Sequence, residues 1–259
     1  MRRAAGPLPP FTLGGRSGVS LLLTSGAPGA LWVARMSRPG HAGFFALEAR
    51  GAIAPTAHMT PDFELERAAL AQGFARVCGV DEVGRGPLAG PVTAAAVVLD
   101  PRNVPAELND SKQLSIKVRQ RLDAEIRACA DVSVAHATVE EIDEINILRA
   151  SHLAMERAIS GLRTPADFVL IDGRMIPRGL NLPAQGVVKG DCQSLSIAAA
   201  SIVAKVARDA LMVDLAQQHP GYGWDTNMGY GSKSHMSALR NLGATPHHRR
   251  SFKPIHNML

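Results

Sequence analysis

Four carboxylates stand where a strand or a helix is expected to end or begin: Asp81, Glu82, Asp172 and Asp191. Carboxylate oxygens are the ligands that Mg²⁺ and Mn²⁺ prefer in proteins. Carboxylates held close together repel one another unless a cation lies between them. Two divalent ions could activate a water and stabilise the leaving alkoxide of a phosphodiester. The acids therefore predict a metal-dependent hydrolase of phosphodiesters.

Each acid also has an ordinary structural interpretation. Asp172 precedes Gly173, and Asp-Gly pairs are common in turns. Asp191 comes shortly before a long apolar segment, and aspartate often caps a helix. Asp81 and Glu82 could be solvated acids at a strand end. Taken one by one, these acids would favour the structural interpretation, and only their combination favours a metal site.

A glycine-rich turn follows the first pair of acids, within CGVDEVGRGPLAGPV at 78–92. Adjacent side chains on a strand point to opposite faces, so both acids enter one site only if the strand bends. Gly84, Gly86 and Gly90 permit such a bend. They also let the backbone approach a ligand closely and present N–H groups to it. This turn therefore predicts a ligand contact made by backbone atoms, with Arg85 at its centre.

Two further segments could contact a nucleic acid. In NMGYGSKSH (227–235), Tyr230 lies between two glycines, where an exposed ring could stack on a sugar or base, with Lys233 and His235 near phosphates. In NDSK (109–112), Lys112 could contact a phosphate. The His-His-Arg-Arg run at 247–250 is expected to be a solvated basic end.

Apolar patterning places these residues on alternating strands and helices. We expect an α/β domain around a mixed sheet, because early hairpin strands are followed by alternating helices and strands. The expected strands are 76–82, 92–99, 132–139, 168–171 and 186–189. The expected helices are 62–75, 115–130 with Ser115 as its cap, one or two within 140–161, 195–217 and 232–242.

The formal net charge of +5 is located in the first 58 residues, which contain six arginines and one glutamate. These residues are rich in Gly, Pro, Ala and Ser and show no sustained period, so we expect a disordered extension or a start-site artefact, with Met36 or Met59 as alternative starts. The catalytic domain then spans 59–259, including a C-terminal helical part at about 215–259. Cys78, Cys129 and Cys192 form no paired motif, which indicates a reducing, cytoplasmic location.

Deleting residues 1–58 should therefore leave the melting temperature and the cleavage activity nearly unchanged. The segment has no core-forming pattern and carries none of the four acids. Thermal melting and a cleavage assay on the full and shortened chains would check this. A large loss of either property would reveal an ordered or substrate-binding element in the extension.

Five blocks of the sequence together resemble the type 2 ribonuclease H family, specifically bacterial ribonuclease HII. They are CGVDEVGRGPLAGPV, LNDSKQLS, FVLIDG, KGDCQSLSIAAASIVAKVARD and NMGYGSKSH, in this order within 61–254. The resemblance implies a ribonuclease H-like fold with a small C-terminal helical part. The one departure noted is Val83, where the family usually has alanine.

The resemblance also implies roles for individual residues. Asp81, Glu82, Asp172 and Asp191 would be the catalytic acids that bind Mn²⁺ or Mg²⁺, with two ions during catalysis. The backbone of Gly84, Arg85 and Gly86 would sense the ribose 2′-hydroxyl, Tyr230 would stack on the neighbouring deoxyribose, and Lys112 would contact backbone phosphate.

The expected activity is cleavage of the RNA strand of RNA–DNA hybrids, and of duplex DNA containing single ribonucleotides. Cleavage on the 5′ side of the ribonucleotide would leave 3′-hydroxyl and 5′-phosphate ends. We expect a monomer that does not associate with membranes. Three alternatives remain: a metal-dependent exonuclease or phosphodiesterase on a related fold, a non-catalytic nucleic-acid-binding module, and a phosphatase-like metal protein. The first would not need a 2′-hydroxyl reader, the second should lack an acid, and the third should lack the tyrosine loop.

Overall fold

The computed structural model describes residues 33–38, 41–46 and 60–258. The chain divides into two units, residues 1–57 and 58–259. In the first unit the described residues are β1 (Val33–Arg38) and β2 (His41–Ala46), which pair antiparallel. The sequence predicted no strand there. The rest of the expected extension lies outside the described residues, so its disorder and the boundary at residue 58 stay predictions.

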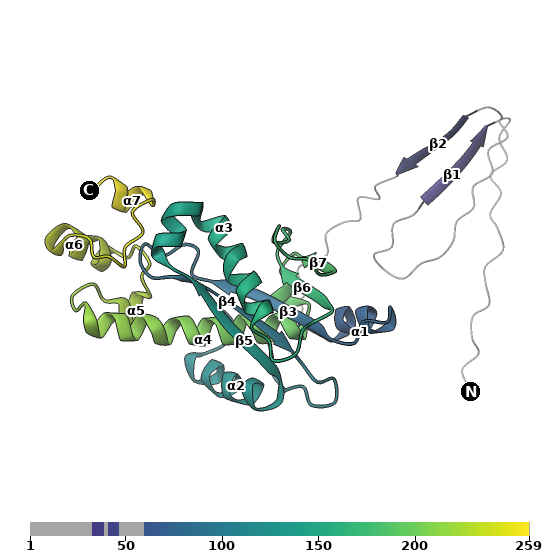
Figure 1. Ribbon diagram of the computed structural model, residues 1–259, viewed down its shortest axis with the longest axis horizontal. Coiled ribbons are helices and arrows are strands. Elements are labelled where there is room, and N and C mark those ends of the chain that lie inside the picture. Colours follow the sequence, from purple (N-terminus) through teal and green to yellow (C-terminus); the bar gives the residue numbers. More distant parts are fainter. Residues whose placement is uncertain (1–32, 39–40, 47–59, 259) are drawn as a thin grey trace. The chain divides into compact units, whose positions relative to one another are not determined.

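A mixed five-stranded sheet forms the centre of the second unit (Figure 1). Its order is β5-β4-β3-β6-β7. The central strand β3 pairs antiparallel with β4 and parallel with β6. The strands are β3 (Val77–Val83), β4 (Val92–Val98), β5 (Asp131–Ala137), β6 (Phe168–Asp172) and β7 (Ala184–Val187). The predicted α/β class with a mixed sheet is confirmed.

Helices cover both faces of this sheet, as Figure 1 shows. Alternate residues of β4 enter two different cores: Ala94 and Ala96 pack with α3, whereas Ala95 and Val97 pack with α2 and α4. This is why β4 is apolar at nearly every position, as expected for a strand covered on both sides. The helices are α1 (Glu64–Ala71), α2 (Ile116–Cys129), α3 (Val139–Ser160) and α4 (Leu195–Gln218).

The alanine-rich start of α4 lies directly against β3. A Cβ at Gly79 would collide with the backbone of Ser196 and Ile197, so only glycine permits this close approach. Ala198, Ala199 and Ala200 are fully buried at the same contact. These small residues let the helix pack closely on the sheet. The close contact fixes the start of α4 relative to the strand that carries two of the acids.

One element boundary differs from the predictions in an informative way. The strand expected at 186–189 is β7, which ends at Val187, shortly before Lys189 adopts a left-handed conformation with φ 56°. The one or two helices expected within 140–161 are α3, which is interrupted at Asn146 (φ 66°). Ser115 does cap α2, since its side chain accepts a hydrogen bond from the N–H of Val118.

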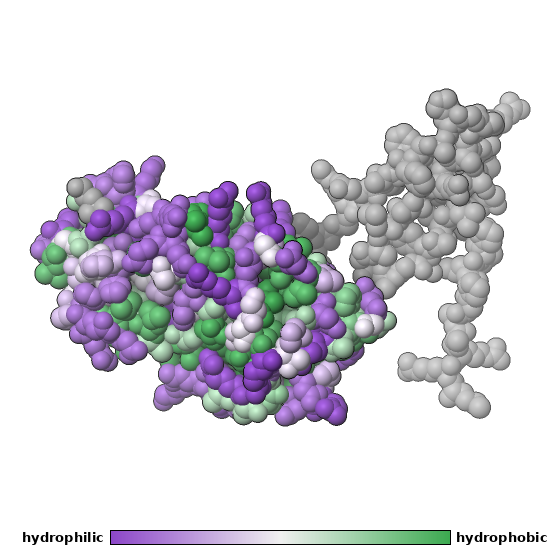
Figure 2. Space-filling view, in the orientation of Figure 1, coloured by the Kyte–Doolittle hydropathy of each residue, from purple (hydrophilic) through white to green (hydrophobic). Residues whose placement is uncertain are grey.

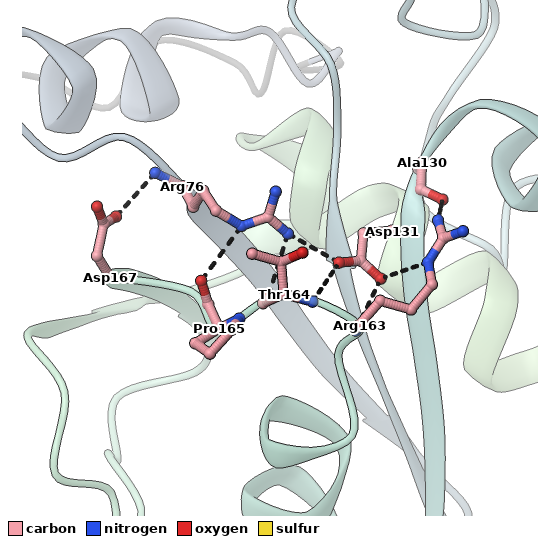
Figure 3. Close-up of polar contacts among 7 residues, drawn as sticks. All are labelled: Arg76, Ala130, Asp131, Arg163, Thr164, Pro165 and Asp167. Atoms are coloured by element: carbon pink, nitrogen blue, oxygen red, sulfur yellow. Dashed lines mark hydrogen bonds and ion pairs between the residues drawn. The ribbon is translucent and has the colours of Figure 1, made fainter.

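A network around Asp131 ties the start of β3 to β5 and to the loop before β6 (Figure 3). Arg76 donates to Asp131 at 2.8 Å and to the carbonyls of Thr164 and Pro165. Arg163 and the N–H of Thr164 donate to the same carboxylate, each at 3.2 Å. These contacts lower the pKa of Asp131 despite its burial. They hold the starts of neighbouring strands together, at the end of β3 opposite to its acids.

A small helical part closes the chain, as predicted. It comprises α5 (Trp224–Asn227), α6 (Lys233–Leu242) and α7 (Lys253–His256). Its own apolar cluster includes Trp224, Leu239 and Ile255 and packs on Leu88 and Ala89 of the glycine-rich turn. The C-terminal part is therefore joined to the turn that follows the first pair of acids.

Among the described residues, no helix combines the length and apolar character that a membrane crossing requires. The face visible in Figure 2 mixes hydrophilic residues with smaller apolar areas. Cys78, Cys129 and Cys192 are all free thiols.

Candidate active site

The first three predicted acids meet at the carboxyl ends of two neighbouring strands. β3 and β6 run parallel, and their last paired residues are Val80 and Ile171. Asp81 and Asp172, the next residue of each strand, therefore lie side by side at the carboxyl ends, where α/β sheets place ligand-binding groups. Glu82 follows Asp81, and its repulsion from Asp172 places its carboxylate in the same cluster.

Asp191 joins the cluster from a short 3-10 helix, η1 (Gly190–Cys192). The N–H of Gly190 donates to Asp172 at 2.7 Å, which links this turn to the end of β6. The residue that caps α4 is Ser194, whose side chain accepts from the N–H of Ile197. Asp191 is therefore not the helix cap that the ordinary interpretation suggested, and its carboxylate faces the other acids instead.

Burial and mutual repulsion of the carboxylates in this cluster favour the binding of a cation. Burial, together with the charges of Glu82 and Asp172, raises the pKa of Asp81 well above its usual value. Burial also raises the pKa of Glu82, although Arg85 at 3.0 Å partly offsets it. The Oε2 atom of Glu82 is buried and has no hydrogen-bond partner among the described residues. A buried acceptor without a donor, among repelling carboxylates, fits a divalent metal ion.

A fifth carboxylate, which the sequence analysis did not single out, belongs to the same region. Ligand atoms of Asp110, Asp191 and Cys192 all lie within 4.8 Å of one another. Burial, Asp110 and Asp172 raise the pKa of Asp191. Lys112 extends over these groups, with its Nζ 3.5 Å from Asp191 and 3.8 Å from Asp110. The position of Asp110 in the same turn as Lys112 was the available signal.

The residues predicted to read the substrate lie beside one another. Tyr230 is 46% exposed, and its Cε1 would lie 3.4 Å from a Cβ placed on Gly86. The ring therefore contacts the glycine-rich turn without covering it. Gly84 adopts φ +93°, and a Cβ there would collide with Arg208, so this position requires glycine.

Two predictions about basic residues are wrong. His235 was expected near phosphates but is fully buried, and the run at 247–250 was expected to be solvated, although His248 and Arg249 are buried. The segment at 247–249 is buried because it pairs with 88–90, through an Ala89–His248 bridge and hydrogen bonds at both ends. His235 is buried because its ring bonds to Trp224 and His248. The exposed Lys233 and Arg250 remain free to act as solvated charges.

The two buried histidines connect the C-terminal segment to the tyrosine loop. The N–H of Thr245 donates to His248 Nδ1 at 2.9 Å, and the Nε2 atoms of His248 and His235 are 3.0 Å apart. Because Trp224 Nε1 donates to His235 Nε2, the ring proton of His235 lies on Nδ1, which donates to the carbonyl of Tyr230 at 2.9 Å. Both rings are neutral in this arrangement. Burial and the neighbouring His235 lower the pKa of His248 to about 4.

Stability should therefore fall as the pH is lowered from about 6.5 to about 4. In this window His248 is protonated in the unfolded state but stays neutral in the folded state. Its contribution to the free energy of unfolding is therefore complete above pH 6.5 and lost as the pH approaches 4. Denaturant unfolding of the wild type and His248→Gln across this range would measure it. Because the acids of the cluster also titrate, the difference between the two curves is the relevant quantity. Parallel curves would contradict the prediction.

Comparisons with known proteins agree on one family. The model of the family described as Ribonuclease HII matches residues 78–255. A Ribonuclease HII from Roseobacter denitrificans is 73% identical over 190 residues, covering 73% of this chain and 96% of the relative. One from Cereibacter sphaeroides is 67% identical over 199 residues, covering 77% and 94%.

Solved structures are similar as well. The ribonuclease H2 from Pyrococcus horikoshii matches with a TM-score of 0.60 at 27% identity, over 71% of this chain and 97% of that protein. Bst-RNase HIII in complex with Mn²⁺ matches with a TM-score of 0.56 at 18% identity, over 95% and 91%. The second likeness concerns the fold alone.

Proposed function

The chain belongs to the ribonuclease HII family, and from this premise we propose that it cuts the RNA strand of RNA–DNA hybrids as an endonuclease. The proposed substrates include duplex DNA with a single embedded ribonucleotide. The observation that carries the proposal is the meeting of Asp81, Glu82 and Asp172 with Asp191, beside a turn and an exposed ring able to contact a sugar.

A divalent metal ion is implied by the family, and the donor set suits it. Asp81, Glu82, Asp172 and Asp191 would hold Mn²⁺ or Mg²⁺, and Asp110 lies close enough to Asp191 to contribute. When bound, two such ions would activate a water and stabilise the leaving oxygen, which gives 5′-phosphate and 3′-hydroxyl ends. Because the pKa values of Asp81 and Asp191 are raised, these carboxylates would be held in their charged form by a bound cation.

The chain's other residues would bind and orient the substrate. Lys112 has an exposed side chain whose ammonium lies 3.5 Å from Asp191, so it can bridge the acids and a backbone phosphate. The N–H groups of Arg85 and Gly86 have no acceptor among the described residues and can donate to a ribose 2′-hydroxyl. The ring of Tyr230, beside Gly86, can pack on a sugar that lacks this hydroxyl. Together these groups select a ribonucleotide that is followed by DNA.

The proposal is tested by incubating the purified protein with three labelled duplexes, with and without Mn²⁺ or Mg²⁺. The duplexes are all-DNA, DNA with one ribonucleotide, and a full RNA strand on DNA. We expect metal-dependent cutting of the second and third only, because phosphate contacts cannot distinguish RNA from DNA. Comparable cutting of the all-DNA duplex would refute the 2′-hydroxyl reader and favour a general nuclease.

A further inference from the structure

The side chain of Arg249 lies beneath the glycine-rich turn and is completely buried. Its Nη2 donates to the carbonyl of Gly84 at 2.6 Å and its Nη1 to the carbonyl of Arg85 at 2.9 Å. Its Nε donates to the carbonyl of Gly90, and its own N–H to that of Leu88, both at 2.9 Å. A single residue of the C-terminal segment thus binds both ends of the turn.

All side-chain acceptors of this guanidinium are backbone carbonyls. Among the described residues, no carboxylate forms an ion pair with Arg249. Burial and the neighbouring Arg208 lower the pKa of Arg249 to about 9. Burying a cation without a counter-ion is costly, and an apolar residue would be a cheaper way to attach this segment. The planar fork of arginine is suited to two adjacent oxygens at once, which a lysine cannot match.

The consequence of this contact follows from the geometry of the peptide bond. In a planar trans peptide the C=O and N–H point in opposite directions. The carbonyl of Gly84 shares a peptide plane with the N–H of Arg85, and the carbonyl of Arg85 shares one with the N–H of Gly86. Because both carbonyls point to the buried Arg249, both N–H groups point away from it. Arg249 thereby sets the direction of two consecutive donors.

A turn of this composition needs such support. Gly84 and Gly86 flank Arg85, so the backbone could otherwise rotate between many conformations. The side chain of Arg85 does not restrict it, since it is exposed and pairs with Glu82. The second buried arginine, Arg208, binds different carbonyls, those of Ala89, Pro91 and Met228. Among the described residues, only Arg249 binds the two peptide groups that would face the ribose.

We propose that Arg249 is a positioning residue for ribose recognition: it orients the N–H groups of Arg85 and Gly86 so that both donate to the 2′-hydroxyl oxygen. The inference rests on the proposed function, since it assigns a cause to the selectivity proposed there. Because the carbonyls of Gly84 and Arg85 already accept hydrogen bonds from Arg249, the 2′-hydroxyl acts at this turn chiefly as an acceptor.

The test compares Arg249→Lys with a control of similar cost to stability. The lysine keeps the charge but cannot bind both carbonyls in a fork. Leu122→Ala removes core volume in the apolar cluster between α2 and α4, and Leu122 is not one of the proposed site residues. For each protein one measures kcat and KM on the single-ribonucleotide duplex, the inhibition constant of an all-DNA duplex as competitor, the melting temperature, and its shift on adding Mn²⁺.

We expect Arg249→Lys to lower kcat/KM by about 10- to 100-fold, the effect of misaligning two hydrogen-bond donors to one hydroxyl. The inhibition constant of the all-DNA competitor and the Mn²⁺-induced shift should stay as in the wild type, because neither depends on the 2′-hydroxyl. Leu122→Ala should lower the melting temperature and leave the kinetic constants nearly unchanged.

Three results would overturn the inference. Arg249→Lys could retain wild-type kcat/KM, or it could weaken binding of the all-DNA competitor in proportion, which would show a general structural role. It could also fail to melt cooperatively, which would show that Arg249 is needed for folding itself. A wild type that does not distinguish the two duplexes would instead refute the proposed function, and the inference with it.

Discussion

Replacing Asp81 by Asn should lower cleavage of a ribonucleotide-containing duplex by about 1,000-fold or more, since a metal ion contributes several kcal/mol to phosphodiester cleavage. The amide keeps the shape of the side chain but removes the charge that binds the ion. The same substitution should raise the melting temperature of the metal-free protein. Burial and the charges of Glu82 and Asp172 make the Asp81 carboxylate unfavourable there, as its raised pKa shows.

Single-turnover cleavage and thermal melting with and without Mn²⁺ would measure both effects. Asp172→Asn should behave in the same way, because Asp172 ends the neighbouring strand. Asp209→Asn is the matched control: Asp209 lies on α4 and pairs with Lys205 at 2.8 Å, away from the cluster. Activity of Asp81→Asn within a few-fold of the wild type would exclude the four-carboxylate metal site.

Replacing Tyr230 by Ala should lower kcat/KM at an RNA–DNA junction by about 10- to 100-fold, the range expected for loss of one stacked ring. The ring is 46% exposed and contacts Gly86, so it is available to a sugar and contributes little to the core. Metal binding should be preserved, because Tyr230 carries no carboxylate. The melting temperature should change little, because the ring is exposed.

Tyr230→Phe provides the control for this experiment. No described residue forms a hydrogen bond with the Tyr230 hydroxyl, so phenylalanine should keep most of the activity. Kinetics on the single-ribonucleotide duplex and Mn²⁺-dependent melting of both variants would be compared. Full activity of Tyr230→Ala would show that the ring takes no part in selecting the substrate.

The acids could be found from the sequence because their positions follow from local patterns. Asp81 and Asp172 each end an apolar run, and apolar runs of that length predict buried strands. Parallel neighbours then bring the two strand ends together, which the structure shows through the Val80–Ile171 pair. The small residues at the start of α4 are also a local pattern, and they permit the close contact with the sheet that occurs at Gly79.

Other parts of the site could not be found in this way. Arg249 and His248 were predicted to belong to a solvated basic end, because basic residues near a terminus are usually exposed. The actual partners of Arg249 are backbone carbonyls at 84–90, and the ring of His248 bonds to His235 and Thr245. A backbone carbonyl leaves no trace in the sequence of its neighbour. Asp110 was overlooked for a related reason: its closeness to Asp191 depends on how two distant loops meet.

The contact between Arg249 and Gly84 also orders events during synthesis. The two residues are 165 positions apart, so at about 5–20 residues per second a ribosome needs roughly 8–33 s to translate from one to the other. In the later part of that interval, once β6 has been made, the strands carrying Asp81 and Asp172 can pair, while the turn beside them lacks its support. Ribose selectivity should therefore be acquired last, after the proposed catalytic acids are already in place. A nascent chain arrested before residue 249 should bind metal and still fail to distinguish a ribonucleotide from a deoxyribonucleotide.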